Sequence, residues 1–499
     1  MSTPTGTRTI TGTETAMATG TPGTPQPIGL PIASNGRWYD NDNVATGIQV
    51  QNLDASAPAN LTVELVDGAG NVAMRVDRVA APGGAPNFYL PTILHDMPAL
   101  RDLFSVRVTS DRPQGAIVRT DWFDTHGAAI YTDPEPGADV IVPVFVRRHG
   151  GFSSVVSIQN IHAVSATVSI TAFGGPDGRV AAATATLTIA PNASRHLFAA
   201  FDSAFQGLGD FEGWLRVSGP DGGLGVTSFV IADRSRGNPQ AVYGFEGLPV
   251  TSAASSLNVA LFRSAQQGVL PADRLNTRFY VVNPGPMPAS VTLAFYGSDN
   301  AAASTACRGS SFAQSEVLIP PGGRHTFEQR PGPEHNLPAD CFGTAHINTA
   351  NASQRVVATV VDATNADELL SAYSAMPDAG AARRVALPLF RRNHVGLSTG
   401  IQVMNAGTTP ATVHIDFSAT NAATGASTPI VGCTVCTQTV QPNASYTWWP
   451  PAIAAIPDGT FGAAVVTANV PVVVLVNDYP TSPTGPASDP ATYLGIAAP

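Results

Sequence analysis

Two short motifs near the C-terminus carry residue types that do chemistry in other proteins. GLSTG (396–400) has the GxSxG spacing of a serine nucleophile, with Ser398 in the reactive position. That spacing works where a strand precedes the serine and a helix follows it, because the sharp turn between them exposes the hydroxyl. The strand-like segment GIQVMN follows here, so we expect Ser398 to be structural. No HExxH motif, P-loop or paired-carboxylate arrangement appears, and the sequence predicts no enzyme.

The second motif is CTVC (433–436), which holds two of the four cysteines. A CxxC can be a zinc or redox motif, but there is no second CxxC, no nearby His pair and no βαβ pattern. Four cysteines allow three connectivities, and the pairs Cys307–Cys341 and Cys433–Cys436 are favoured. Closing the longer loop stabilises a fold by roughly 3–4 kcal/mol in the chain-entropy model. Disulfides imply an oxidising compartment.

An Asn, an Asp and a Tyr recur at similar places in four stretches of the chain. Oxygen ligands at the loop ends of a β-sandwich can bind Ca²⁺, but one acid per stretch makes a weak calcium cage. We therefore expect the Asn to form turns, the Asp to accept backbone N–H bonds and the Tyr to be core residues whose hydroxyls bond the backbone. No cofactor is expected, with structural calcium at Asp40 and Asp42 as the alternative. The recurring residues are Asn52, Asn160, Asn283 and Asn405; Asp121, Asp233, Asp362 and Asp478; and Tyr131, Tyr243, Tyr373 and Tyr493.

These residues recur because the chain itself repeats. Each Asn ends a strand-like segment, after which come an alternating segment, a Pro-led turn and a Phe-led strand. Such a period over 499 residues predicts four like units, each large enough for its own core. Short runs rich in Val, Ile, Thr and Ala, with 47 Gly and 42 Pro, predict an all-β fold with seven or eight strands a unit. The expected boundaries are a leader at 1–27 and copies one to four at 28–138, 139–250, 256–379 and 384–499. Because the joints are short, we expect a semi-rigid rod.

This pattern resembles the immunoglobulin-like and fibronectin-like β-sandwich repeats of bacterial cell-surface proteins. The resemblance covers residues 28–499 and rests on strand spacing and repeat length. The Cys, Trp, Cys pattern of antibody domains is absent. What the resemblance implies is four tandem immunoglobulin-like β-sandwich domains in an extracellular protein with an adhesive or structural role.

Two groups of side chains are candidate ligand or interface residues. Trp448 and Trp449 stand where copy one has a Phe and a Tyr, so at least one should be core and the other could stack on a sugar ring or a neighbouring subunit. Two arginine pairs occupy the same place in copies two and four and could bond an acid across a joint or between subunits, with a solvated surface as the alternative. These pairs are Arg147/Arg148 and Arg391/Arg392.

The charge balance excludes some partners. Charged residues are 12% of the chain, every basic residue is Arg and the net charge is −10, so nucleic acid is not an expected partner. The longest apolar run, VPVVVLV at 470–476, is too short to cross a bilayer, and no membrane insertion is expected. The N-terminus has no signal-peptide pattern, which predicts either a removed signal or another export route.

The leader and the function complete these expectations. Thr occupies every odd position from 3 to 15, so an extended leader would place seven Thr on one face. It is either a flexible Thr/Pro/Gly segment or a donor strand for an open sheet edge. We expect a non-enzymatic structural protein of the cell exterior that self-associates into a surface layer, sheath or filament. The alternative is an adhesin or carbohydrate-binding array whose partners are surface glycans.

Overall fold

The computed structural model describes residues 26–499 apart from 39–41, 98–99, 101, 124–126, 221, 233–241, 268–273, 301–302, 330–336, 365–369, 423 and 482–489. Most of the described chain is β-strand, which confirms the all-β expectation. None of the helices in this part is long and apolar enough to span a membrane. Most of the leader, Asp40 and Asp233 lie outside the described residues.

Copies one and two contain the first seventeen strands. Those of copy one are β1 (Ile28–Trp38), β2 (Asp42–Asn52), β3 (Ala59–Val66), β4 (Val72–Ala80), β5 (Asn87–Tyr89), β6 (Leu103–Ser110), β7 (Gln114–Trp122) and β8 (Gly127–Thr132), with helix α1 (Leu90–Ile93). Those of copy two are β9 (Asp139–Arg147), β10 (Phe152–Asn160), β11 (Ala166–Gly174), β12 (Val180–Ile189), β13 (Ser194–Phe198), β14 (Phe211–Ser218), β15 (Leu224–Ala232), β16 (Val242–Glu246) and β17 (Leu248–Pro249), with 3₁₀ turns η1 (Ser203–Phe205) and η3 (Val250–Ser252).

Copies three and four contain the rest. Those of copy three are β18 (Ser256–Ser264), β19 (Gln266–Gln267), β20 (Arg274–Val282), β21 (Ala289–Gly297), β22 (Ser311–Ala313), β23 (Val317–Ile319), β24 (Arg324–Glu328), β25 (Cys341–Thr349), β26 (Val357–Thr364), β27 (Leu370–Ser374) and β28 (Met376–Pro377), with η4 (Asp378–Gly380). Those of copy four are β29 (Ala382–Arg392), β30 (Leu397–Asn405), β31 (Ala411–Thr420), β32 (Ser427–Ile430), β33 (Thr437–Val440), β34 (Ser445–Trp448), β35 (Thr460–Pro480), β36 (Ala491–Leu494) and β37 (Ile496–Ala497), with η5 (Pro450–Ala452).

Copy two shows the sheet plan most simply. Its outer sheet has the order β12-β11-β14-β9-β17 and its inner sheet the order β13-β10-β15-β16. The other copies follow this antiparallel plan with local changes: the β1–β2 hairpin joins the two sheets of copy one, and the single strand β35 serves both sheets of copy four. Each inner sheet ends on a strand that we call the closing strand: β8 in copy one, β16 in copy two, β27 in copy three and β36 in copy four.

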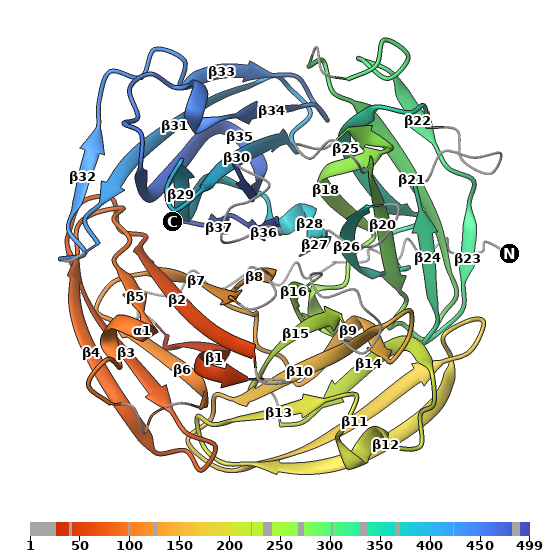
Figure 1. The fold of residues 1–499 in the computed structure, drawn as a ribbon. Coiled ribbons are helices and arrows are strands. Elements are labelled where there is room, and N and C mark those ends of the chain that lie inside the picture. Colours follow the sequence, from red (N-terminus) through yellow and green to blue (C-terminus); the bar gives the residue numbers. More distant parts are fainter. Residues whose placement is uncertain are drawn as a thin grey trace, which may run out of the picture.

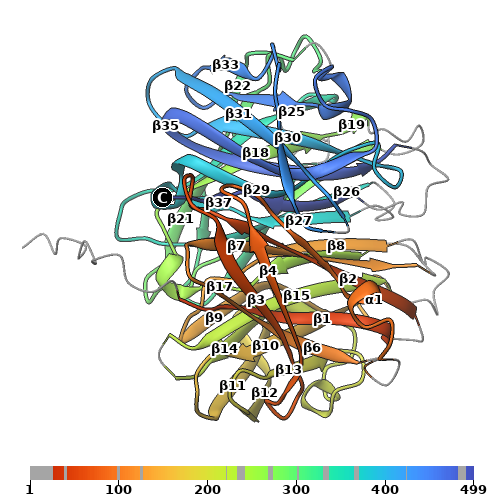
Figure 2. The same cartoon turned by 90° about the vertical axis from the view of Figure 1, so that its left-hand side faces the viewer.

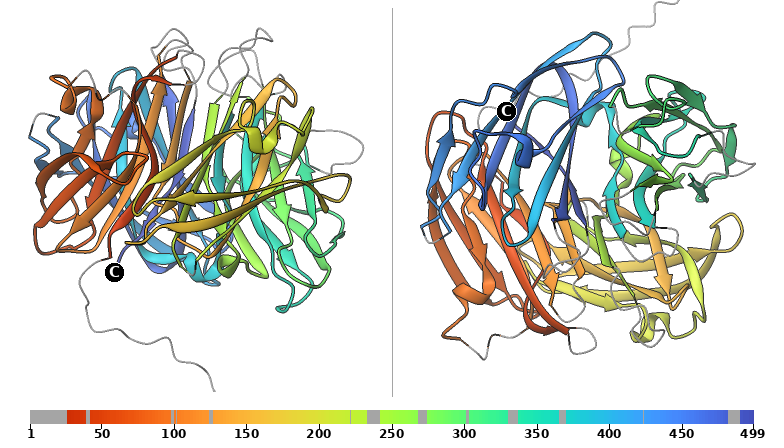
Figure 3. Two further views of the ribbon diagram at one scale, coloured as in Figure 1. Left: turned by 90° about the horizontal axis from the view of Figure 1, so that it is seen from below. Right: turned by 45° about the horizontal axis from the view of Figure 1, so that its top comes forward.

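The four copies form a closed ring (Figure 1), so the expected rod is wrong. The closing strands meet at the centre, where β8 contacts β16, β16 contacts β27, β27 contacts β36, and β36 contacts β8. The first strand of each copy packs on the inner sheet of the next, and β29 of copy four packs on β2 and β7 of copy one. Figures 2 and 3 show copies one and four side by side at this closure. One head-to-tail contact, made four times, turns the chain back on itself.

Apolar side chains on the inner sheets drive this contact. All nine residues of β15 are buried, because one face lies in the core of copy two and the other against copy one. Burial of apolar surface is worth roughly 25 cal/mol per Å², so each copy stabilises its neighbour. The residues that join the hydrophobic cluster of the preceding copy include Phe229 and Ile231 from copy two, Val361 and Ala363 from copy three, Val473 and Leu475 from copy four, and Ile117 and Ile130 from copy one.

A β-bulge interrupts the first strand of every copy, where its pairing with the Phe-led strand skips two residues. Pro stands first in three of these bulges, a place where a strand tolerates the missing N–H. A Tyr hydroxyl bonds both the N–H and the C=O of the second bulge residue. The pairs are Tyr131 with Ile32, Tyr373 with Leu261 and Tyr493 with Leu389.

Replacing Tyr493 by Phe should therefore destabilise the protein. The ring would still fit, but the N–H and C=O of Leu389 would be buried without their partner, at a cost of about 1–3 kcal/mol. Thermal and urea unfolding would measure the loss. Tyr446→Phe is the matched control, since this ring is 37% exposed, and equal stability of both variants would contradict the assigned role.

Candidate functional site

The recurring Asn ties each inner sheet to the neighbouring turns. Asn52 Nδ2 donates to the C=O groups of Ala57, Ala80 and Ala81, while its Oδ1 accepts the N–H of Asp54. Asn160 and Asn283 make the same set of contacts at equivalent places, Asn405 makes it with two C=O groups in place of three, and all four are buried. Their hydrogen-bonding groups thus serve the fold, in the Asx-type turn expected from the sequence.

Ser398 is fully buried. Its Oγ donates to Asn393 Oδ1 and accepts the N–H of Asn393, each at 2.9 Å. Ser153 in copy two makes the equivalent bond to the N–H of Arg148. The hydroxyl therefore fastens a tight turn between two strands and has the structural place expected for it.

The pairs Arg147/Arg148 and Arg391/Arg392 were expected at the same place in copies two and four, but the structure shifts one pair by one residue relative to the other. Arg147 bonds the C=O of Ala199 and Leu208, and Arg392 bonds those of Ile453 and Ile456, so these two are equivalent. Arg148 bonds the C=O of Ala200. Arg391 is instead a buried partner of an acid, as described below.

The Asp and Tyr positions are equivalent in only some copies. In each copy the recurring Asn lies level with one residue of the neighbouring inner strand. Asp362 and Asp478 each lie six residues after that residue in the sequence, whereas Asp121 lies seven residues after it. By the same count Phe245, not Tyr243, occupies the closing tyrosine position in copy two. The sequence comparison therefore matched Asp121 and Tyr243 to their counterparts wrongly, because residue identity can agree while strand register differs.

A buried charge cluster lies where copy four meets copy one. Asp478 Oδ2 accepts from Arg391 at 2.5 Å and from Arg119 of copy one at 2.9 Å, and Arg119 also bonds Asp121. Arg119 and Asp478 side chains are each 2% exposed. Burial lowers the pKa of Arg391, and Asp478 opposes that shift. This cluster joins the last copy of the ring to the first. Neither Arg119 nor its role was predicted from the sequence.

A second charged contact joins copies three and four. Arg263 bonds Asp362 within copy three and the Tyr479 hydroxyl of copy four. Burial would lower the pKa of Arg263, but Asp362 and Tyr479 outweigh it and the pKa lies above its usual value. The segment ALFRS matches LPLFRR in copy four, and this match is the sequence signal that could have identified Arg263.

The cysteines and tryptophans lie as follows. Both expected disulfides are formed, Cys307–Cys341 and Cys433–Cys436, and disulfides are typical of proteins outside the cytosol. Trp448 is 2% exposed and Trp449 37% exposed.

Asp42, a calcium candidate from the sequence, begins β2. The described residues hold no group of three or more His, Cys, Asp or Glu that could bind a metal.

A pair of acids lies at one end of the central strands. Glu246 of copy two accepts hydrogen bonds from the N–H and hydroxyl of Thr132 in copy one and from the hydroxyl of Ser374 in copy three. Burial raises the pKa of the nearby Asp133 to about 7, and Glu246 adds to the rise. The Glu246 carboxylate thus connects three copies. Beside it lies Asp133, whose raised pKa favours its protonated form more than in an ordinary Asp.

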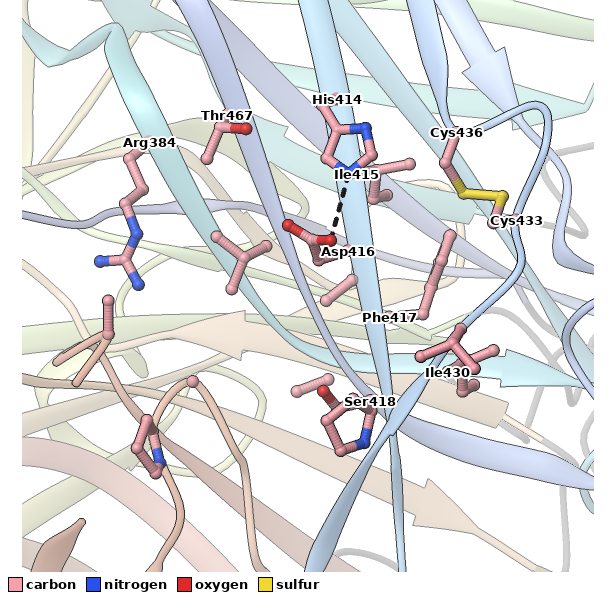
Figure 4. Close-up of a pocket in the computed structure, with 18 of the residues that line it drawn as sticks. Arg384, His414, Ile415, Asp416, Phe417, Ser418, Ile430, Cys433, Cys436 and Thr467 are labelled. Atoms are coloured by element: carbon pink, nitrogen blue, oxygen red, sulfur yellow. Dashed lines mark hydrogen bonds and ion pairs between the residues drawn. A yellow bond between two sulfur atoms is a disulfide. The ribbon is translucent and has the colours of Figure 1, made fainter. Parts of the chain in front are cut away.

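A groove lies on the outer sheet of copy four beside a turn of copy one (Figure 4). Its volume is about 620 Å³. His414 bonds Asp416 at 3.1 Å and Thr437 at 2.8 Å. Thr437, His414 and Asp416 thus stand in the order of a nucleophile, a base and an orienting acid. Asp416 and Thr437 are exposed and the His414 side chain is 44% exposed, so water would screen the acid and compete for the proton. The groove is better suited to binding than to proton transfer.

Comparison with known proteins gives no family. No family model matches the sequence, and no curated protein does. Among solved structures, the Anabaena sensory rhodopsin transducer is similar to 19% of this chain over 92% of its own length, at 21% identity and a TM-score of 0.15. Two Escherichia coli alpha-2-macroglobulin structures, one trypsin-activated and one native, cover 95% of this chain at 9% identity and TM-scores of 0.11, and the chain spans 42% and 40% of their lengths. Scores this low carry no argument, so the function is argued from the residues.

Asp478→Asn tests the charge cluster. Two buried guanidinium groups would lose the carboxylate they share, which should cost about 3–5 kcal/mol in urea unfolding. The control is Asp77→Asn, since Asp77 is 63% exposed and pairs with an exposed Arg75, a type of pair worth about 0–1 kcal/mol. If both variants unfold at the same urea midpoint as wild type, the cluster has no role in stabilising ring closure.

Asp133 predicts a pH dependence of stability. Its folded pKa of about 7 is above the ordinary value of 3.8, so the folded state binds this proton more tightly than the unfolded state. The contribution is complete below about pH 4 and is lost as the pH rises through 7. The free energy of unfolding of wild type, relative to Asp133→Asn, should therefore fall between pH 4 and 7. A difference that stays flat, or that rises with pH, would contradict this assignment.

Proposed function

We propose that this protein is a non-enzymatic extracellular structural protein, a subunit that self-assembles into a surface layer, sheath or filament, and that its copies are immunoglobulin-like β-sandwich domains. The observation that carries the proposal is a hairpin with uncharged strands on the rim of the ring, formed by β11 and β12 in copy two. Its two strands contain no Asp, Glu, Arg or His. The disulfides suit a location outside the cytosol.

β12 has the features of an edge that accepts another strand. It pairs with β11 on one side and is the last strand of its sheet. Thr184, Thr186 and Thr188 are exposed, while the residues between them face the core. Natural sheets usually block such edges with charge, proline or interruption, because an open row of N–H and C=O groups pairs readily with another strand.

The matching edges in the other copies are blocked. β4 of copy one carries Arg75, Asp77 and Arg78. In copy three the edge is divided into two three-residue strands, and in copy four the Cys433–Cys436 turn divides it. The copy-two edge is therefore the one suited to join molecules. The leader, with Thr at alternate positions, is the strand we assign to pair with it from another molecule.

Thr188→Lys should reduce assembly of the purified protein. The lysine would add charge at the open edge, as edge lysines do in natural sheets. Val79→Lys is the matched control, because Val79 and Thr188 occupy the same register on the edges of copies one and two. Negative-stain electron microscopy and light-scattering mass at rising concentration would measure assembly.

Deletion of residues 1–27 is the second arm of this experiment. It should leave the ring folded and prevent polymerisation. Polymers that form unchanged without the leader would exclude it as the donor strand. A wild-type protein that stays monomeric at every concentration would overturn the structural proposal itself.

The alternative function is a glycan-binding adhesin. It is favoured by Trp449, which is 37% exposed and follows the edge strand β34 of an inner sheet, beside Gly400. Exposed indoles stack on sugar rings. Retention of wild type on a glycan array, lost in Trp449→Ala, together with a monomer in solution, would favour this alternative.

A further inference from the structure

The four copies provide an internal comparison at one position of the outer sheet. Two residues stand directly opposite each other on the outward face, one on the strand after the recurring Asn and one on the Phe-led strand. The pairs are Val66 and Ser105 in copy one, Phe173 and Trp214 in copy two, Tyr296 and Thr344 in copy three, and Ser418 and Ala463 in copy four.

In copy two this position is filled by two stacked aromatic rings. The centroids of Phe173 and Trp214 are 4.3 Å apart and their planes differ by 12°. Trp214 is 1% exposed, and its Nε1 donates to the C=O of Gly178 at 2.6 Å. The indole also packs against Val282 and Val357 of copy three. At this joint between copies, the stack occupies the space beneath the next copy.

In copy four the same position holds Ser418 and Ala463, the smallest pair of the four. The groove of about 620 Å³ lies here, between the outer sheet of copy four and Pro82 and Gly83 of copy one (Figure 4). Phe417, Ile430 and the Cys433–Cys436 disulfide contribute apolar walls. Ser418, which is half-buried, and Ala463, which is buried, thus line the groove at the register that two aromatic side chains occupy in copy two.

Two charged side chains, Asp416 and Arg384, line the groove. Asp416 lies two residues from Ser418 on the same face of β31, about 7 Å along the strand. One of its oxygens bonds His414 Nε2, and the side chain is 69% exposed, so it can accept a further donor. Arg384 lies level with His414 on the other side of β35, and it donates to the C=O of Leu53 and of Pro499. Part of that guanidinium is engaged by backbone, whereas the carboxylate faces the groove.

We propose that this groove binds a small planar aromatic ring that carries a cationic arm, with the ring between Ser418 and Pro82 and the cation at Asp416. The position suits a flat aromatic group because copy two holds two stacked aromatic rings there. Sugars fit less well, since the one aromatic side chain among the lining residues, Phe417, is 2% exposed and belongs to the core. This binding is separate from assembly, and neither inference depends on the other.

Tryptamine tests the proposal, because it joins the indole found in copy two to an ammonium group. Isothermal titration calorimetry of the full chain at pH 7 should show one site per molecule. Indole, without the cation, should bind two- to fivefold more weakly, the size of an exposed ion pair. Indole-3-acetate, with the opposite charge, should bind more weakly than indole. No tryptamine binding up to millimolar concentrations would overturn the proposal.

Two variants locate the site. Ser418→Phe with Ala463→Trp grafts the copy-two stack into copy four, and it should abolish tryptamine binding while the melting temperature stays equal or rises. Asp416→Asn changes an exposed residue, and it should remove the preference for tryptamine over indole without affecting indole. Asp77→Asn is the matched control, an exposed acid on the rim of copy one. Tryptamine binding that is unchanged in both groove variants would place the ligand elsewhere and overturn the assignment, whether or not the double variant folds.

Discussion

The structure depends on one physical constraint, the apolar outward face of each inner sheet. A sheet that is hydrophobic on both faces must be covered on both, and here the second cover is the bulged first strand of the preceding copy. Four such contacts close on themselves, so the first copy covers the last without a separate cap. The bulge, its tyrosine and the recurring Asn all shape the surfaces that meet in this contact.

The chemistry of the four joints is not uniform. Copies one and two meet through the apolar contact of Trp122 and Phe229, whereas copies two and three meet through Val361 and Ala363 together with an Arg324–Glu212 ion pair. The joints of copy three with four and of copy four with one instead contain Arg–Asp pairs. Because an unpaired buried charge costs several kcal/mol, a charged face cannot pack well on an apolar one. The different charged partners at the joints therefore favour the correct order of copies over other pairings of four similar units.

The sequence was sufficient for the features that repeat and insufficient for those that depend on closure. Strand type, the turn-forming Asn and the paired cysteines follow from local patterns, and the structure has them. The ring does not follow, because Arg119 and Asp478 are 359 residues apart and no local pattern relates them. Likewise Tyr243 looks like a closing tyrosine in the sequence, but register places Phe245 there, and register is set by pairing across strands.

What distinguishes the copies from one another is therefore more informative about function than what they share. The shared residues have their hydrogen bonds within the fold, as the four Asn and Ser398 do. Copy two departs by leaving its edge strand both uncharged and undivided, and copy four departs by having the smallest pair, Ser418 and Ala463, where copy two has an aromatic pair. A single chain can accept such departures because each copy has a fixed place in the ring, whereas four identical subunits would have to carry every change four times. Joining the copies in one chain thus allows one position to be specialised for assembly and another for a ligand.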